Sequence, residues 1–338
     1  MKLSLLIPFY NEEEQLRETL AAVRPVLARH SDDYEIIAVD DGSEDRTWAL
    51  LSEEAAADPH LHAIRFSRNF GKEAAICAAM EHVDGDAAIL MDGDLQHPPR
   101  YIPEMIRLWQ EEGYDVVEGV KISRGQESKI YRWVASLFYK SFTRLSGVDM
   151  DNASDFKLLD RQVVDAWNAL GEHNTFFRGL SAWLGFKRCE LPFKVDPREH
   201  GKSKWSLAGL WRLSMNALTS FSSVPLSFIT GIGLLFLLLA LVIGIITLVR
   251  YFTGTAMEGF TTVILLNLIV GGATMISLGL IGIYISRIYD EVKGRPRYLK
   301  MEEINPHPLR HQKHDDKTQD HTEDSAPEPA DEAPSEEA

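Results

Sequence analysis

Short apolar runs alternate with longer amphipathic segments over the first 119 residues of the chain. Apolar runs of this length predict buried strands, and the amphipathic segments between them predict helices. Strictly alternating strands and helices are typical of βαβ units on a mostly parallel sheet, so we predict an α/β, Rossmann-like domain. The predicted strands are Leu3–Ile7, Tyr34–Val39, Leu61–Phe66, Ala87–Met91 and Val116–Glu118, and the predicted helices are Glu12–Ala28, Asp45–Ala57, Lys72–His82 and Arg100–Glu112.

The alternation is less regular after residue 119. We predict a helix over Glu127–Leu145, a strand over Phe156–Leu159 and a helix over Arg161–Leu170. These elements complete a catalytic domain that we place at residues 1–205. The segment 206–224 then contains an amphipathic stretch, Leu207–Phe221, which is typical of a helix lying at a membrane interface.

Two long apolar runs follow, over Pro225–Val249 and Phe260–Ile285. Each exceeds the roughly 20 residues that a helix needs to cross a bilayer, so we predict two transmembrane helices within 225–286. Positive side chains concentrate after the second run, in the segment 287–302. The positive-inside rule therefore predicts a multi-pass protein of the inner or plasma membrane, with both termini and the catalytic domain in the cytosol and a short external loop.

The formal charge of −15 and the pI of about 5.2 would argue against an anionic partner, but the acidic residues are unevenly distributed along the chain. Much of the acidity belongs to residues 303–338, whose Pro, Glu, Asp and Ala composition predicts a disordered tail. Residues 121–144 are instead locally basic, which is expected either of a surface that receives an anion or of a solvated helix face. Cys77 and Cys189 lie far apart in sequence and outside any C-x-x-C or zinc-type spacing, which is consistent with a reducing compartment.

Polar clusters directly follow three predicted strands. They are Pro8–Asn11, Asp40–Ser43 and Asp92–Asp94. Because ligands bind at the carboxyl ends of strands in open α/β sheets, the three clusters are expected to share one rim. Paired carboxylates such as Asp92 and Asp94 offer the oxygen ligands that Mg²⁺ or Mn²⁺ accepts, although a turn or helix cap is the alternative for such residues.

Four ordered blocks within the predicted domain match the pattern of a known family. Pro8-Phe9-Tyr10-Asn11-Glu12-Glu13, Val39-Asp40-Asp41-Gly42-Ser43, Arg68-Asn69-Phe70-Gly71-Lys72-Glu73 and Met91-Asp92-Gly93-Asp94-Leu95-Gln96-His97-Pro98-Pro99 together resemble family 2 glycosyltransferases of GT-A fold. The chain is similar to the polyprenyl-phosphate branch, which includes dolichol-phosphate mannose synthase and bacterial undecaprenyl-phosphate glucosyltransferases. The resemblance extends from Lys2 to about Lys300.

The resemblance implies roles for individual residues. Asp41 is expected to contact the base, and Asp92 and Asp94 to hold the metal. Asp155, within Ser154-Asp155-Phe156-Lys157, resembles the acidic residue of the family's Gly-Asp-Phe-Arg block, which serves as a base or positions the acceptor. We predict Asp155 and Asp94 as catalytic residues. The nucleotide-sugar contacts that we predict are Pro8, Tyr10, Asn11, Glu13, Asp41, Lys72, Asp92 and Gln96.

A second group of residues is expected to bind the lipid phosphate. The family has an arginine after the strand at Val116, where this chain has Lys121, and a lysine does not offer the same bidentate geometry. Arg132 and Ser136 lie four residues apart on one predicted helix face. Arg198 and Lys202 belong to a basic segment that resembles the family's mobile loop, although their composition alone predicts only a surface loop.

The predicted reaction is the transfer of one sugar from a nucleotide diphosphate sugar, UDP-linked in our prediction, to undecaprenyl or polyprenyl phosphate. The resemblance to the family implies that this transfer is inverting. A phosphate monoester has its second pKa near ~6, so the acceptor is already anionic and needs little general-base help. The larger barrier is repulsion between two anions, which metal and basic side chains offset. The product is a lipid-linked sugar for cell-envelope glycosylation.

Other interpretations remain open at this stage. A processive polysaccharide synthase shares the early motifs, but it usually has more membrane helices and a Gln-x-x-Arg-Trp block, which Lys129–Trp133 matches only in part. A membrane scaffold that retains the fold without turnover is the alternative outside enzymes. The resemblance also implies a homo-oligomer and a flippase partner, and we expect no nucleic-acid partner.

Overall fold

A computed structural model describes residues 1–31, 33–121, 153–172, 175–194, 224–253 and 259–306. Within these ranges eight strands form one mixed sheet, in the order β7-β5-β6-β4-β1-β2-β3-β8. The central strands β4, β1, β2 and β3 are mutually parallel, and β6 runs antiparallel to β4. The strands are β1 (Lys2–Phe9), β2 (Asp33–Asp40), β3 (Leu61–Phe66), β4 (Ala87–Leu90), β5 (Val116–Lys121), β6 (Ala153–Asp160), β7 (Arg188–Phe193) and β8 (Lys300–Ile304).

Helices cover both faces of this sheet and bury two apolar layers. Successive side chains of β1 point to opposite faces of the sheet. Leu3, Leu5 and Ile7 pack in the layer beneath α1, α2 and α4, whereas Leu6 packs in the layer beneath α3, α6 and α7. The helices and the 3₁₀ turn in the described residues are α1 (Leu16–His30), α2 (Thr47–Ala57), α3 (Lys72–Glu81), η1 (Pro99–Tyr101), α4 (Ile102–Glu112), α6 (Arg161–Ala169), α7 (Phe177–Trp183), α9 (Val224–Phe252) and α10 (Phe260–Val292).

The predicted α/β architecture is confirmed, and the elements predicted within the described residues are present. Sequence analysis missed β7 and β8. The run Lys300–Ile304 is mostly polar, and it becomes a strand by pairing antiparallel with β3 at the edge of the sheet. The boundary that we placed between residues 302 and 303 therefore falls inside β8.

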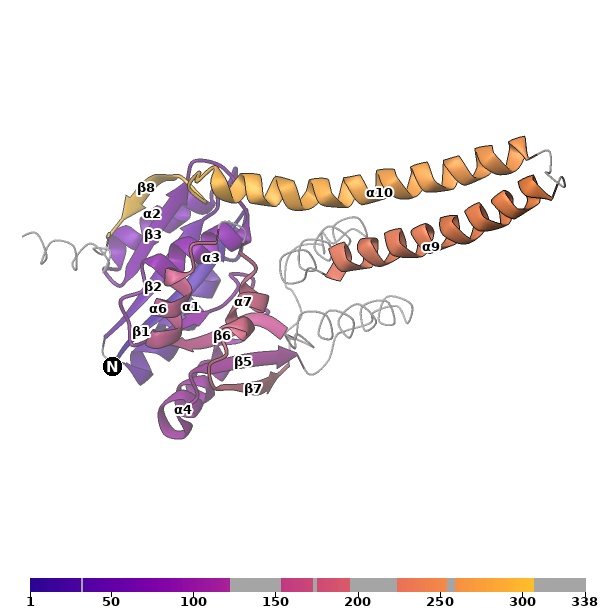
Figure 1. The fold of residues 1–338 in the computed structure, drawn as a ribbon. Helices are drawn as coiled ribbons and strands as arrows, with labels where there is room; N and C mark the ends of the chain where they lie inside the picture. Colours follow the sequence, from indigo (N-terminus) through magenta and orange to yellow (C-terminus); the bar gives the residue numbers. More distant parts are fainter. Residues whose placement is uncertain (32, 122–152, 173–174, 195–223, 254–258, 307–338) are drawn as a thin grey trace, which may run out of the picture.

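Two long apolar helices extend from the domain. Figure 1 shows α9 and α10 running beside one another away from the sheet, and α10 returns the chain to β8. Ile229–Ile246 and Ile269–Val292 have mean hydropathies of 2.9 and 1.8, and neither segment is buried by the rest of the protein. Their length and composition are sufficient for crossing a membrane. The amphipathic stretch Leu207–Phe221 and the predicted helix Glu127–Leu145 lie outside the described residues.

Candidate active site

The polar clusters that follow β1, β2 and β4 meet at one edge of the sheet, as the parallel topology requires. Strand β6 adds to this edge because its antiparallel register pairs Leu90 with Lys157, which places Asp155 level with Asp92. These segments surround a cavity of about 370 Å³. Its lining residues are Pro8, Phe9, Tyr10, Glu12, Asp41, Asn69, Gly71, Lys72, Asp92, Gly93, Asp94, Gln96, Lys121 and Arg178.

A network of four charged side chains lies at this cavity, and three of them, Lys72, Asp92 and Arg178, line it. Lys72, the first residue of α3, places Nζ 2.5 Å from Asp92 Oδ1 and 2.5 Å from Asp155 Oδ2. Arg178 of α7 donates from Nε to Asp155 Oδ1 at 2.7 Å and from a terminal nitrogen to Asp155 Oδ2 at 2.9 Å. Asp155 therefore accepts charge-assisted hydrogen bonds from two cations, one of them bidentate.

These contacts set the protonation state of Asp155. Burial by itself raises the pKa of this carboxyl, but the positive charges of Lys72 and Arg178 outweigh burial and hold the pKa well below its usual range. The pKa of Lys72 is raised by Asp155 and Asp92 against the opposing effect of desolvation. Asp155 is consequently ionised, and both of its oxygens already accept hydrogen bonds from Lys72 and Arg178. This arrangement favours a role in positioning these side chains over a role in abstracting a proton.

Asp92 and Asp94 present carboxylates to the same cavity, separated by a glycine. A Cβ on Gly93 would collide with the Phe9 ring and the Glu12 carboxylate, so the close approach of this turn to β1 requires glycine. Thr19 fixes the turn by donating to the Gly93 carbonyl at 2.6 Å. Two adjacent carboxylates opening into a polar cavity form an oxygen donor set that fits Mg²⁺ or Mn²⁺.

Asp41 holds the loop that leads into α3. Its carboxylate accepts hydrogen bonds from the backbone N–H groups of Phe70 at 2.7 Å and Gly71 at 2.9 Å. Gly71 adopts φ 99°, a conformation that favours glycine. Burial raises the pKa of Asp41 to about 6, although these hydrogen bonds act in the opposite direction. Asp41 therefore fixes the position of Lys72 while it also lines the cavity.

The structure divides the predicted nucleotide-sugar residues into two groups. Pro8, Tyr10, Asp41, Lys72, Asp92 and Gln96 line the cavity. Asn11 and Glu13 are not among its described lining residues, and they connect neighbouring loops instead. Asn11 Oδ1 accepts the Glu44 N–H at 2.9 Å, and Glu13 accepts the Arg46 N–H at 3.0 Å.

Lys121 lines the cavity at the end of β5. Burial and the neighbouring charge of Arg178 lower the pKa of Lys121. Sequence analysis missed Arg178, the guanidinium of the cavity, because no quoted block contains it and α7 approaches β6 only in the folded chain. Glu73, also missed, accepts the Phe177 N–H at 2.9 Å and thereby joins α3 to α7.

The residues that flank Asp155 have structural partners. Ser154 donates to the Gly119 carbonyl at 2.5 Å. Lys157 is buried, where it pairs with Glu118 at 3.0 Å and donates to Ser181 at 2.8 Å. The side chain of Lys157 is not among those lining the cavity in the described part of the chain, so it supports β5, β6 and α7 rather than the substrate site.

The remaining predicted lipid-phosphate residues are outside the described part of the chain. Arg132 and Ser136 fall within 122–152, and Arg198 and Lys202 fall within 195–223. Both segments adjoin elements of the site. The first connects β5, which ends at Lys121, to β6, which carries Asp155, and the second follows β7.

The open α/β sheet, the Asp-Gly-Asp turn at its carboxyl edge and the charged cavity define a nucleotide-sugar glycosyltransferase of GT-A type. Residues 4–167 match the family model described as "Glycosyl transferase family 2". The chain belongs to this family. The matched segment contains every cavity residue except Arg178.

Similar proteins extend the likeness through the two long helices. The chain is 38% identical over 304 residues to the protein named uncharacterized glycosyltransferase YkcC of Bacillus subtilis, covering 88% of this chain and 92% of that one. It is 36% identical over 301 residues to a prophage bactoprenol glucosyl transferase homolog of Escherichia coli, covering 88% and 98%. A solved glucosyl-3-phosphoglycerate synthase from Mycobacterium tuberculosis is 20% identical, with a TM-score of 0.44 and coverage of 65% and 80%.

Proposed function

We propose that this glycosyltransferase moves a single sugar from a nucleotide diphosphate sugar, UDP-linked in the first instance, to undecaprenyl or another polyprenyl phosphate. The observation that carries the proposal is the cavity in which Asp92, Lys72, Asp155 and Arg178 contact one another beside Asp94. Relatives named bactoprenol glucosyl transferases, similar over nearly their whole length, support the lipid acceptor. Two membrane-length helices suit an acceptor that never leaves the bilayer.

Asp92 and Asp94 are proposed as the ligands of Mg²⁺ or Mn²⁺, because their carboxylates match the oxygen preference of these ions. When bound there, the ion neutralises charge on the leaving diphosphate. In the same proposal Asp41 contacts the base, and Pro8, Tyr10, Lys72 and Gln96 contact the rest of the donor. Asn11 and Glu13 contribute by holding together the loops that follow β1 and β2.

Arg178 and Lys121 are proposed to receive the acceptor phosphate, together with Arg132, Ser136, Arg198 and Lys202. Two like-charged phosphates repel strongly at close range in a site of low dielectric constant, and fixed cations reduce this cost. Asp155 orients Lys72 and Arg178 between the two substrates. A single displacement of this kind inverts the anomeric centre.

The proposal places the catalytic domain, residues 1–205, and both termini in the cytosol, with α9 and α10 crossing the inner or plasma membrane. The positive side chains that follow α10 support this orientation. The interfacial segment 206–224 carries the domain to the bilayer, and residues after 306 form an acidic tail. We further propose a homo-oligomer, and a flippase that moves the lipid-linked sugar outward.

The test is transfer of radiolabelled sugar from a panel of UDP- and GDP-sugars into organic-extractable undecaprenyl phosphate by the purified full chain. Each donor is tried with Mg²⁺, with Mn²⁺ and with a chelator. We expect metal-dependent labelling from one donor, and loss of labelling in the Asp94→Ala variant. The matched control is Asp165→Ala, because Asp165 is an exposed residue of α6 that pairs with Arg161.

One result would contradict the proposed reaction, and another would contradict only the metal assignment. Absence of labelling from every donor, with folded and membrane-inserted protein, would favour a scaffold or another acceptor. Unchanged labelling by the Asp94→Ala variant would remove the metal assignment while leaving the reaction intact.

A further inference from the structure

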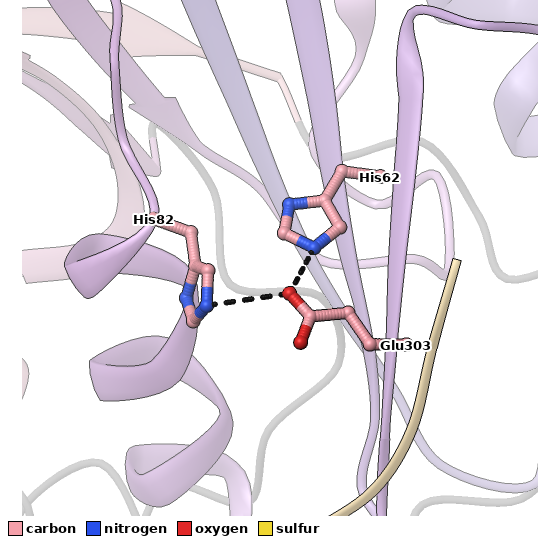
Figure 2. Close-up of side chains that lie close together, drawn as sticks. All are labelled: His62, His82 and Glu303. Carbon is pink, nitrogen blue, oxygen red and sulfur yellow. Dashed lines mark hydrogen bonds and ion pairs between the residues drawn. The ribbon is translucent and has the colours of Figure 1, made fainter. Parts of the chain in front are cut away.

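Two histidines and a glutamate from three separate elements meet away from the cavity. His62 lies near the start of β3, His82 directly follows α3, and Glu303 belongs to β8. The start of β3 is the edge of the sheet opposite to the carboxyl ends that form the catalytic cavity. Figure 2 shows both rings pointing at the Glu303 carboxylate. None of the three residues has a part in the proposed transfer.

The separations suit a single small ion. His62 Nε2 lies 2.8 Å from Glu303 Oε1, and His82 Nε2 lies 3.6 Å from the same oxygen. The three ligand atoms are all within 4.8 Å of one another. A tetrahedral zinc ion with bonds of about 2.0–2.1 Å sets its ligand atoms about 3.3 Å apart, so only small side-chain movements are needed.

The orientation of His82 is already suited to coordination. Its Nδ1 lies 2.7 Å from the Ala78 carbonyl, an acceptor, so this nitrogen carries the proton and Nε2 presents its lone pair. Both rings are buried, which favours the neutral form that binds metals, and burial lowers the pKa of His82. Two imidazoles and one carboxylate form the donor set of many zinc sites, with water as the fourth ligand.

We propose that His62, His82 and Glu303 bind Zn²⁺ or a similar divalent transition-metal ion, and that this ion fastens β8 to β3 and α3. The site differs chemically from Asp92 and Asp94, whose oxygens prefer harder ions. Its position gives it a structural effect, because β8 immediately follows the second membrane-length helix. The ion links the catalytic domain to the segment that leaves the membrane.

Lys300 is the one positive side chain whose contacts with this cluster are described. Its Nζ lies 3.5 Å from His82 Nε2 and donates to Glu303 Oε2 at 2.9 Å. The side chain is 37% exposed, so it can turn into solvent when an ion takes its place beside His82. Lys300 therefore competes with the ion, and its removal is expected to strengthen metal binding.

The experiment measures Zn²⁺ binding to the full chain in detergent by equilibrium dialysis, with the protein prepared without a polyhistidine tag. His307, His311, His314 and His321 also lie in the sequence, so each variant keeps them and only differences from the wild type are interpreted. We expect Glu303→Gln and His82→Gln to lose one equivalent of bound Zn²⁺, or at least about tenfold in its affinity. Lys300→Gln should bind about tenfold more tightly.

His60→Gln is the matched control, because His60 stacks on Tyr34 at 4.6 Å and contacts the Tyr34 carbonyl instead of the cluster. It should bind as the wild type does. Glu303→Gln retains the size of the side chain and therefore decides the outcome if His82→Gln does not fold. The proposal would be overturned if Glu303→Gln bound Zn²⁺ with wild-type stoichiometry and affinity, or if Lys300→Gln bound it more weakly. His62, His82 and Glu303 would then be a hydrogen-bonded cluster that binds no ion.

Discussion

Arg178 shows how one side chain completes a site. Asp155 is 5% exposed, and its charge is balanced by Lys72 from one direction and by the Arg178 guanidinium from another. Removing either cation leaves the buried Asp155 carboxylate with only one positively charged partner. A buried charge that is incompletely paired destabilises the folded protein. The family pattern predicts an arginine near position 121, where this chain has Lys121, and Arg178 of α7 lines the same cavity.

We predict that Arg178→Ala lowers kcat/KM for sugar transfer by roughly 10- to 100-fold. A hydrogen bond to a charged group contributes about 1.5–3 kcal/mol, and each 1.4 kcal/mol corresponds to about tenfold in rate. Steady-state labelling of polyprenyl phosphate measures the change. Arg107→Ala is the control, since Arg107 pairs with Glu104 on the surface of α4. Equal activity of the two variants would show that Arg178 has no part in transfer.

A second residue-scale prediction concerns Glu73. Burial, followed by the nearby charge of Asp155, raises the pKa of Glu73 from its ordinary 4.5 to about 7. The folded chain therefore binds this proton more tightly than the unfolded chain, so the contribution of Glu73 to stability is lost as pH rises from about 4.5 to 7. Glu73→Gln retains an acceptor for the Phe177 N–H and removes the titration.

We expect Glu73→Gln to be more stable than the wild type at pH 8, by on the order of 2 kcal/mol, and to match it at pH 4.5. Thermal unfolding of the detergent-solubilised chain at the two pH values measures this difference. The control is Glu111→Gln, which alters an exposed glutamate of α4. A difference in Tm that does not depend on pH would contradict the titration of Glu73.

At the scale of elements, β8 connects the membrane-length helices to the sheet. It pairs with β3, and Trp48 Nε1 donates to Glu302 at 3.0 Å. Asn305, directly after the strand, donates from its amide nitrogen to the carbonyls of Ala55 at 2.7 Å and Leu61 at 2.9 Å. Side-chain contacts on both sides of the strand thus hold this polar edge segment in place.

Asn305→Ala is predicted to loosen β8 without unfolding the sheet. The variant loses its contacts to carbonyls of the α2–β3 connection, which we expect to accelerate local opening by about tenfold. Hydrogen exchange of those amides in Ala63–Phe66 that point toward β8, and not toward β2, should then rise. Amides of β1 in the sheet centre serve as the internal reference. Unchanged exchange at β3 would show that Asn305 does not hold the strand.

At the scale of the whole molecule, α9 and α10 are the elements that the proposed function places in the membrane. Their apolar side chains are exposed, and so large an apolar surface is not stable in water. The carboxyl edge of the sheet contains the cavity, and the chain passes from α10, which ends at Val292, to β8, which begins at Lys300. Because β8 is paired with the sheet and follows α10, it would limit rotation of the catalytic cavity relative to the bilayer.

We predict that an epitope inserted within residues 254–258 is reached by antibody from outside intact spheroplasts, whereas an epitope after residue 338 is reached only after the spheroplasts are permeabilised. The positive side chains after α10 favour retention of that end in the cytosol. Flow cytometry of the two insertions measures the orientation. Labelling of the carboxyl-terminal epitope in intact cells would contradict the proposed topology.

The sequence by itself determined the α/β class, the order of the early strands and helices, and the two membrane-length helices. These features follow from local periodicity and run length, which are properties of neighbouring residues. It also located Asp41, Asp92 and Asp94, because strand-end carboxylates share one rim in any parallel sheet.

Only the tertiary structure decided the rest. Arg178 reaches Asp155 because α7 packs on β6, and β8 forms because β3 offers an unpaired edge. His62, His82 and Glu303 come together across more than 200 residues of sequence for the same reason. Each of these contacts joins segments whose local pattern carries no information about the partner, so their chemistry appears only when the chain is folded.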